Sequence, residues 1–407
     1  MSGVPPEAAG PAQALPPLAA GGALAPSGLR PGAPAWLPYG DAMRVLGVAA
    51  IIVIHVCDMV LFSKDDVGTT HWWVVNFVDA GGRWAVPVFI MLSGALLLNP
   101  SRPQTAMEFY RRRLARLGIA TIFWSAFFMA LSVYYTGWCV GTWDVPAGEG
   151  AWKHGIWKDL LKGQPYMHLH FVFRLAGLYL LTPMLRVYVR HAPWGLRAWM
   201  MLAVLSLAMA NSVATPFLGT EPSGFAILWP FLGFYLAGDV LRDVTATGRK
   251  AAWSAAGLVV STAVIAIGTG RLTVAGQQPH AYPSMDMVMY DFLNPARVLS
   301  SFCAWFLLAW WFTRVPARSL TQRAMKALAP LTLGIYLVHP LFREVLWKDG
   351  YRLVQQYVPK DVWPDGFLWH RPAWWIGMPL IMLAVAAGSV ALTWLLRLVP
   401  GVRKITG

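Results

Sequence analysis

"YGDAMRVLGVAAIIVIHVCDMV" (Tyr39–Val60) is an apolar run with an arginine, Arg44, near its start and a histidine, His55, well inside it. A run of about twenty such residues is long enough to cross the ~30 Å hydrocarbon core of a bilayer as a helix. On that helix, eleven residues turn Arg44 and His55 to within about 20° of each other and place them about 16 Å apart. Ionisable groups are costly at mid-membrane, so His55 is a functional candidate. For Arg44, contact with lipid headgroups is an equal alternative.

The composition of the whole chain predicts an integral membrane protein. Of the 407 residues, 57% are hydrophobic and only 13% are charged, and the mean hydropathy is +0.50. A soluble domain carries charge on about a quarter of its residues. The three cysteines, Cys57, Cys139 and Cys303, form neither a disulfide framework nor a zinc-ligand spacing, so no metal is expected.

The first 40 residues differ from the rest of the chain. They contain nine Pro, seven Gly and ten Ala and no long apolar block. Such a segment buries too little surface to offset the entropy of ordering. We therefore expect residues 1–40 to be a disordered cytoplasmic tail and residues 41–400 to be one membrane domain.

Apolar segments of membrane-spanning length recur along that domain. They predict an all-α fold of about ten transmembrane helices, at residues 42–62, 83–98, 115–136, 168–188, 196–215, 222–241, 251–269, 294–314, 327–346 and 373–398.

Loop charges predict the orientation of these helices. Basic residues gather in alternate loops, at Arg30, 102–116, 186–197, 242–250, 314–326 and 397–404. Lys and Arg are enriched on the cytoplasmic side of membrane proteins, so both termini are expected there. This topology explains most of the net charge of +14, and a nucleic-acid partner is not needed to explain it.

Other polar residues lie inside the predicted helices. In LGIYLVHPLF (333–342), His339 is expected about 18 Å from the inner boundary, and in HLHFVFRLAGLYLLTP (168–183) Arg174 is expected about 9 Å below the outer one. His55, His339 and Arg174 would then share one layer, with His168 and His170 at its mouth. Each alone could be a structural hydrogen bonder, but a shared layer favours a polar cavity.

Histidine and arginine in a cavity with few carboxylates suit acyl transfer to a hydroxyl. A histidine can take a proton from an alcohol near neutral pH, and an arginine can stabilise an oxyanion. Asp58 follows His55 by three residues, and it either orients the ring or, as we favour, is solvated at the outer boundary. Ser93 could be an acylated nucleophile, but a Ser-Gly pair in a membrane helix more often allows close helix packing.

A basic pair marks the cytoplasmic entrance of the third predicted helix. In FYRRRLARLGIA (109–120), Arg113 and Arg116 are three residues apart and share a helix face. Two guanidinium groups can hold phosphates, although such a cluster is also a common topology or lipid signal.

Together these segments resemble the membrane acyltransferase-3 family, which includes bacterial O-acetyltransferases of cell-surface and exported saccharides. The resemblance covers about residues 39–398 and includes the Arg44-x10-His55 spacing, VPVFIMLSGALLL (86–98), Arg113-x-x-Arg116, the stretch from His168 and the Tyr336-x-x-His339-Pro motif. Where the family usually has His-Leu-Trp-Phe, this chain has His170 in place of Trp, which changes the side chain available for an acceptor ring to stack on.

The resemblance implies roles for these residues. Arg44 and His55 would be the catalytic pair, and Arg113 and Arg116 would bind acetyl-CoA, the acyl donor. The acceptor, a lipid-linked or exported saccharide, would contact His168, His170, Arg174, Tyr336 and His339. Membrane lipid is the other expected partner and the bacterial inner membrane the expected location. No residue predicts the oligomeric state.

Two alternatives from other classes remain at this point. A sugar or lipid flippase would also need a polar cavity, although proton-coupled transporters generally place carboxylates at mid-depth. A purely structural membrane subunit would not need ionisable groups at one depth.

Overall fold

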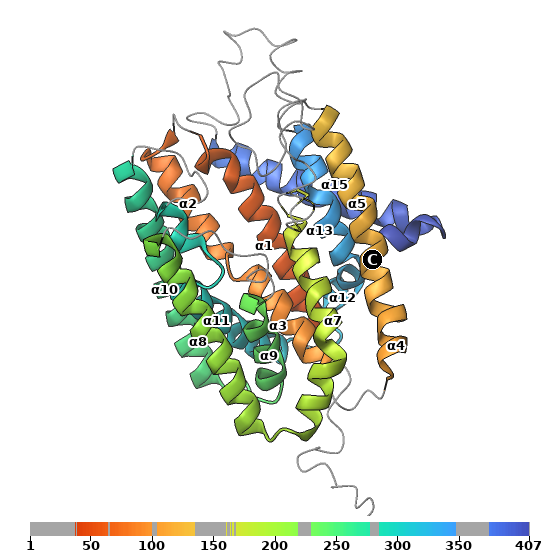
Figure 1. Cartoon of the computed structure of the whole chain (residues 1–407). Helices are drawn as coiled ribbons and strands as arrows, with labels where there is room; N and C mark the ends of the chain where they lie inside the picture. Colours follow the sequence, from red (N-terminus) through yellow and green to blue (C-terminus); the bar gives the residue numbers. More distant parts are fainter. Residues whose placement is uncertain are drawn as a thin grey trace, which may run out of the picture.

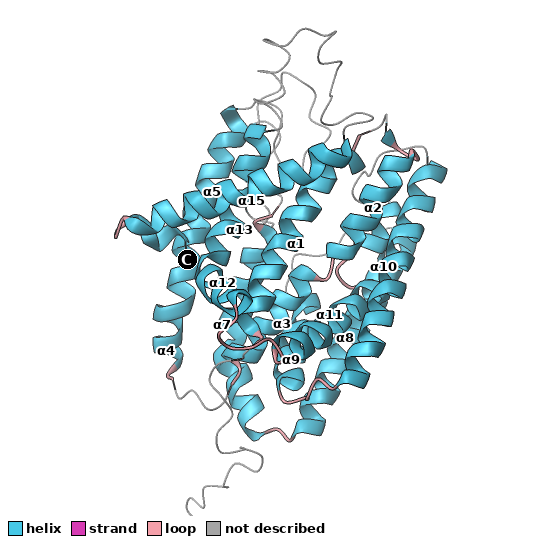
Figure 2. Ribbon diagram, turned by 180° about the vertical axis from the view of Figure 1, so that it is seen from behind, coloured by secondary structure: helices cyan, strands magenta, loops and turns pink. Residues whose placement is uncertain are grey.

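The computed structural model describes residues 37, 39–63, 66–99, 104–134, 160, 163, 165–166, 168–218, 229–276, 285–346 and 374–406. Within these ranges all regular structure is helical, and no strand is present (Figure 2). The all-α fold predicted from the sequence is therefore confirmed. Residues 1–36, which hold most of the predicted tail, lie outside the described residues.

The helices follow one another along the chain as labelled in Figure 1. The first half of the chain forms α1 (Gly40–Leu61), α2 (Thr70–Gly82), α3 (Ala85–Leu97), α4 (Ala106–Phe109), the π-helical turn η2 (Tyr110–Leu114) and α5 (Ala115–Tyr134). The middle forms α7 (His170–His191), α8 (Trp194–Leu218), α9 (Trp229–Arg242) and α10 (Gly248–Gly276). The last part forms η4 (Met285–Tyr290), α11 (Pro295–Phe312), α12 (Leu320–Leu328), η5 (Ala329–Leu331), α13 (Thr332–Glu344), α15 (Trp374–Leu398) and η7 (Val402–Thr406).

Nine helical runs of the described residues are long and apolar enough to cross a membrane. They begin at Gly40, Thr70, Ala106, His170, Trp194, Gly248, Val288, Leu320 and Trp375. The remaining predicted span, 222–241, contains all of α9 except its last residue, and the first seven residues of the span lie outside the described ranges. The chain is thus a multi-pass membrane protein, and a count of about ten helices fits it. The cytoplasmic placement of the termini stays a prediction.

The second membrane span begins at Thr70, earlier than residue 83, the start predicted from the sequence. It consists of α2 and α3, which are separated by a break at Arg83 and Trp84. Polar residues in α2 lower its hydropathy, which is why the pattern missed it. The structure buries them with partners: the Asn76 side chain, for example, donates to the Ala266 carbonyl oxygen at 2.7 Å.

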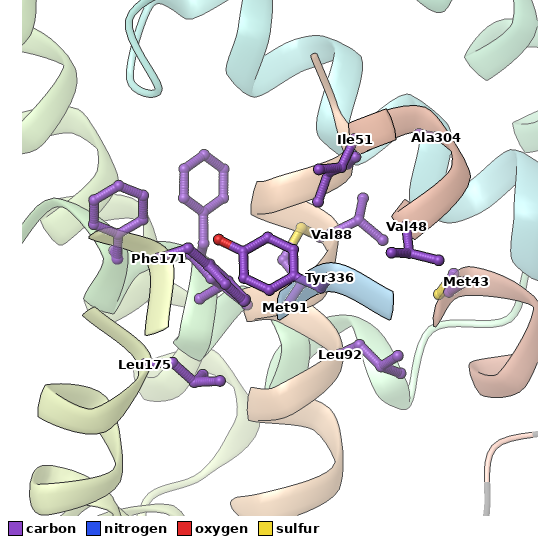
Figure 3. Packing of buried hydrophobic residues seen from close by; sticks show 14 of the residues in the cluster. Met43, Val48, Ile51, Val88, Met91, Leu92, Phe171, Leu175, Ala304 and Tyr336 are labelled. Carbon is purple, nitrogen blue, oxygen red and sulfur yellow. The ribbon is translucent and has the colours of Figure 1, made fainter. Parts of the chain in front are cut away.

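The centre of the bundle is formed by α1, α3, α7 and α13, with α8, α10 and α11 on one side and α5 on the other, while α15 runs obliquely across the bundle and packs on α13 and α1 (Figures 1 and 2). Side chains from several of these helices meet in one apolar core, including Ile51, Met91, Phe171 and Tyr336 (Figure 3). The outward faces of the flanking helices are also apolar: Trp199, Trp253 and Val259 are 72%, 75% and 70% exposed. Such large exposed apolar surfaces are expected where a protein faces lipid.

Two glycines allow α3 and α9 to pack with their backbones in contact. A Cβ atom at Gly94 would lie 1.8 Å from the Tyr235 carbonyl oxygen, and one at Gly238 would lie 1.7 Å from the Met91 carbonyl oxygen. No side chain fits at such distances, so glycine is required on both helices. This contact fixes α3, whose first residue follows the break at Arg83 and Trp84.

Candidate active site

Three histidines from separate parts of the chain meet near the middle of the bundle. The ring of His55, on α1, is stacked on that of His339, on α13, with a centroid distance of 5.2 Å and an interplanar angle of 26°. The ring of His168, just before α7, meets His339 edge-on at 5.4 Å. Tyr336, one turn before His339, donates its hydroxyl proton to the His168 carbonyl oxygen. The structure therefore brings together His55, His168, Tyr336 and His339 of the predicted site.

Hydrogen bonds define which nitrogen of each stacked ring can act as a base. The Nδ1 atom of His339 lies 2.7 Å from the Tyr336 carbonyl oxygen, which only accepts, so Nδ1 carries the proton and Nε2 keeps its lone pair. The Nδ1 atom of His55 lies 3.1 Å from a carboxylate oxygen of Asp58, which favours the same tautomer. Only His55 remains partly accessible, with its side chain 18% exposed, whereas His168 and His339 are each 1% exposed. His55 is thus the ring best placed to meet a substrate.

Asp58 is buried and does not face solvent at the membrane boundary as we favoured from the sequence. It is 7% exposed and contacts the His55 ring through one oxygen and Arg83 through the other, at 3.9 Å from Nη2. Arg343, on α13, is close enough for its charge to act on Asp58. The carboxylate is therefore in the position that orients a catalytic histidine.

The break between α2 and α3 carries ionic residues that sequence reasoning missed. The Arg83 Nε atom lies 2.6 Å from Asp79, which is fully buried, and the guanidinium lies 3.8 Å above the Tyr290 ring. The i, i+4 spacing of Asp79 and Arg83 in an apolar region was the available signal. Asp79, Asp58 and Glu344 are all buried, so the bundle interior does contain carboxylates. Their scarcity therefore no longer argues against a transporter.

His170 and Arg174 form a second group around the Phe292 ring. The His170 ring lies 5.7 Å from that of Phe292, and the Arg174 guanidinium lies 5.2 Å from the Phe292 centroid and 4.5 Å from that of Phe231. Arg297 lies on Phe292 at 3.9 Å. Arg174 is also close enough to Tyr336 for its charge to act on the hydroxyl, so the two groups adjoin. Phe292 and Arg297 had no recognisable motif in the sequence.

Arg44 lies with Arg113 near the start of α1, about 16 Å along the helix axis from His55. It forms an ion pair with Asp41 at 3.1 Å, and its side chain remains 35% exposed. Tyr179 lies close to both arginines and hydrogen-bonds the Ser93 side chain. These neighbours place Arg44 beside Arg113 and away from the histidines. Its expected catalytic role stays a prediction.

The predicted donor residues Arg113 and Arg116 are exposed and lie close to each other. Arg113 belongs to the π-helical turn η2, a distortion that is frequent at functional sites. Arg397 and Arg403, near the end of the chain, also lie close to Arg116. The result is a cluster of positive charge that can attract phosphate groups.

Ser93 has the surroundings of a packing residue. Its hydroxyl donates to the Phe89 carbonyl oxygen at 2.9 Å within α3, and the adjacent Gly94 makes the contact with α9. Of the two interpretations given to this Ser-Gly pair, close helix packing is the one these contacts support. Among the residues that the structure describes, no group of three or more His, Cys, Asp or Glu side chains is arranged to hold a metal ion.

Residues 37–398 match the model of a family described as an acyltransferase domain. No curated protein and no solved structure matches the chain. The matched range includes every helix from α1 to α15 and all the site residues named above except Arg403. The chain therefore belongs to the acyltransferase-3 family and is a multi-pass membrane acyltransferase.

Proposed function

We propose that the protein transfers an acetyl group from cytoplasmic acetyl-CoA to a hydroxyl of a lipid-linked or exported saccharide in the bacterial inner membrane. The observation that carries this proposal is His55, whose Nδ1 bonds the buried Asp58 and whose Nε2 is thereby left as a base. A base of this kind is what an alcohol needs to become a nucleophile.

In this mechanism His55 Nε2 accepts the proton of the acceptor hydroxyl as its oxygen attacks the thioester carbonyl carbon. The tetrahedral intermediate collapses with cleavage of the carbon–sulfur bond, and the proton on His55 passes to the departing sulfur. The products are the acetyl ester and free CoA, and His55 is again neutral. Asp58 keeps the ring oriented throughout and stabilises its transient positive charge.

The donor is held at the end of the bundle where α1 begins. Arg113 and Arg116 would bind the phosphates of CoA, with Arg44 and Tyr179 beside them. The pantetheine arm would then extend along α1 over the roughly 16 Å that separate Arg44 from His55. This path delivers the thioester to the base, and it assigns Arg44 to the donor more readily than to the oxyanion.

The acceptor would approach from the opposite end of α1. His339 is stacked on the His55 ring, His168 and Tyr336 pack against His339, and His170 and Arg174 flank Phe292. Histidine and arginine side chains donate to sugar hydroxyls, and an aromatic ring can pack against the apolar face of a sugar ring. The proposal therefore assigns all five residues predicted to bind the acceptor to this half of the site.

Reconstitution tests acyl transfer against transport. Purified protein in proteoliposomes is given acetyl-CoA labelled in the acetyl group outside and a saccharide with free hydroxyls inside. We expect labelled ester on the saccharide, and no ester when the donor is replaced by free CoA with labelled acetate. Movement of the saccharide across the bilayer without ester formation would support the flippase alternative instead.

Replacing both Arg113 and Arg116 with Ala should weaken acetyl-CoA binding by about ten-fold or more, because charge-assisted hydrogen bonds to charged groups contribute about 1.5–3 kcal/mol each. Folding should be nearly unchanged, since exposed basic residues contribute little to stability. Calorimetric titration of acetyl-CoA into the purified double variant measures the loss. Arg111→Ala together with Arg112→Ala is the control, because these arginines belong to the same exposed turn. Equal affinity in both double variants would refute the assignment.

A further inference from the structure

Arg83 joins the His55–Asp58 pair to the rest of the protein. It lies at the break between α2 and α3, and its side chain is only 13% exposed. Its Nη2 atom is 3.9 Å from Asp58 Oδ1, and its Nε atom is 2.6 Å from Asp79 Oδ2. One guanidinium therefore bridges a carboxylate on α1 and a carboxylate on α2.

Residues from α11 and the segment before it fix this bridge from the other side. The Arg83 guanidinium is stacked on the Tyr290 ring at 3.8 Å. Arg297, which is 2% exposed, donates from Nε to the Arg83 carbonyl oxygen at 2.9 Å and also to the Tyr290 carbonyl oxygen. Both the backbone and the side chain of Arg83 are thus held.

We propose that Arg83 is a positioning residue for the transfer reaction, which holds Asp58 so that Asp58 in turn directs Nε2 of His55 to the substrate. This inference rests on the general-base role proposed above for His55. Arg83 itself touches no reacting atom, and its effect passes through Asp58.

The charges around the bridge agree with this role. Asp58 is faced by His55 on its own helix, by Arg83 from the α2–α3 break and by Arg343 from α13. Asp79 has Arg83 as its ion-pair partner. Without Arg83, two buried carboxylates lose a shared counter-charge, and Asp58 is then free to turn toward Arg343 and away from the His55 ring.

The shape of the guanidinium is required as well as its charge. Two nitrogens of one planar group reach different carboxylates while its face lies on Tyr290. An ammonium group is a single point charge and cannot do all three at once. Lysine at this position is therefore expected to be a poor substitute.

A double-mutant cycle with R83Q, D58N and R83Q/D58N tests the proposal. Steady-state acetyl transfer is measured for each variant in proteoliposomes. We expect R83Q to lower kcat by about 10–100-fold, as removal of a group that orients an active-site side chain does elsewhere, with KM for acetyl-CoA within about two-fold of wild type. The double variant should be no slower than D58N alone, because both residues act through the same ring.

The matched control is R197Q. Arg197, on α8, forms an equivalent buried ion pair, 2.7 Å from Asp239, with its side chain 12% exposed. This pair lies near the opposite end of the bundle, where Arg242, which also contacts Asp239, is close to Tyr39 at the start of α1. R197Q should lower the thermal midpoint as R83Q does, yet keep kcat per folded molecule.

Two results would overturn the proposal. One is an equal loss of kcat per folded molecule in R83Q and R197Q, and the other is losses at Arg83 and Asp58 that multiply in the double variant. If R83Q does not fold, R83K is measured instead, and wild-type kcat in R83K would also overturn it. A wrong assignment of His55 as the base can be told apart from a wrong role for Arg83. In that case His55→Ala retains turnover, whatever the double-mutant cycle shows.

Discussion

His55→Ala is expected to lower kcat for acetyl transfer by about 10²–10⁴-fold, the range that a general base contributes. Acetyl-CoA should still bind, because Arg44 lies about 16 Å from His55 along α1, on the side where it neighbours Arg113. The variant should also fold, since His55 is partly exposed and alanine favours a helix. Acetylation kinetics and a calorimetric titration of the donor on the same preparation measure the two parts of this prediction.

The control for His55 is His191→Ala, at the exposed end of α7, where the ring hydrogen-bonds the Val187 carbonyl oxygen of its own helix. Its turnover should equal that of wild type. Near wild-type turnover in His55→Ala would contradict the mechanism. His339→Ala would then be decisive, because His339 also presents Nε2 with its lone pair and its ring is stacked on that of His55.

The sequence was sufficient to predict the all-α fold, most of the membrane-spanning helices and a shared depth for His55 and His339. Hydropathy identifies membrane-spanning segments because the bilayer imposes their length and composition. A fixed rise per residue then converts positions into depths, which is why two histidines on helices far apart in sequence could be assigned to one layer. The structure places their ring centroids 5.2 Å apart.

The sequence could not predict which residues contact Arg44, Arg83 and Asp79. The direction of Arg44 on α1 could be worked out, but only the packing of other helices shows that it lies beside Arg113 and Tyr179. Arg83 and Asp79 were missed for a different reason. They interrupt an apolar pattern, so hydropathy leaves Asp79 in a loop and places Arg83 at the first position of a predicted helix, whereas the structure buries both and pairs them with each other.

Gly94→Ala and Gly238→Ala are each expected to destabilise the protein by about 3 kcal/mol or more, beyond the usual range for overpacking. The added methyl groups would lie 1.8 Å and 1.7 Å from backbone carbonyl oxygens. Backbone atoms cannot rotate away as a side chain does, so α3 and α9 must separate along their contact. A lower thermal midpoint and a smaller yield of monodisperse protein after detergent extraction would measure this.

Gly118→Ala is the matched control, because the same substitution on α5 would meet no atom within 4 Å. In a helix that change should be neutral or stabilise the protein by about 0.5–1 kcal/mol.

The two glycines on α3 and α9 also have a functional consequence, since α3 begins directly after the break that holds Arg83. Any Gly94→Ala or Gly238→Ala protein that does fold should therefore lose kcat as R83Q does and still bind acetyl-CoA. Stability equal to that of Gly118→Ala would show that α3 and α9 do not pack this closely.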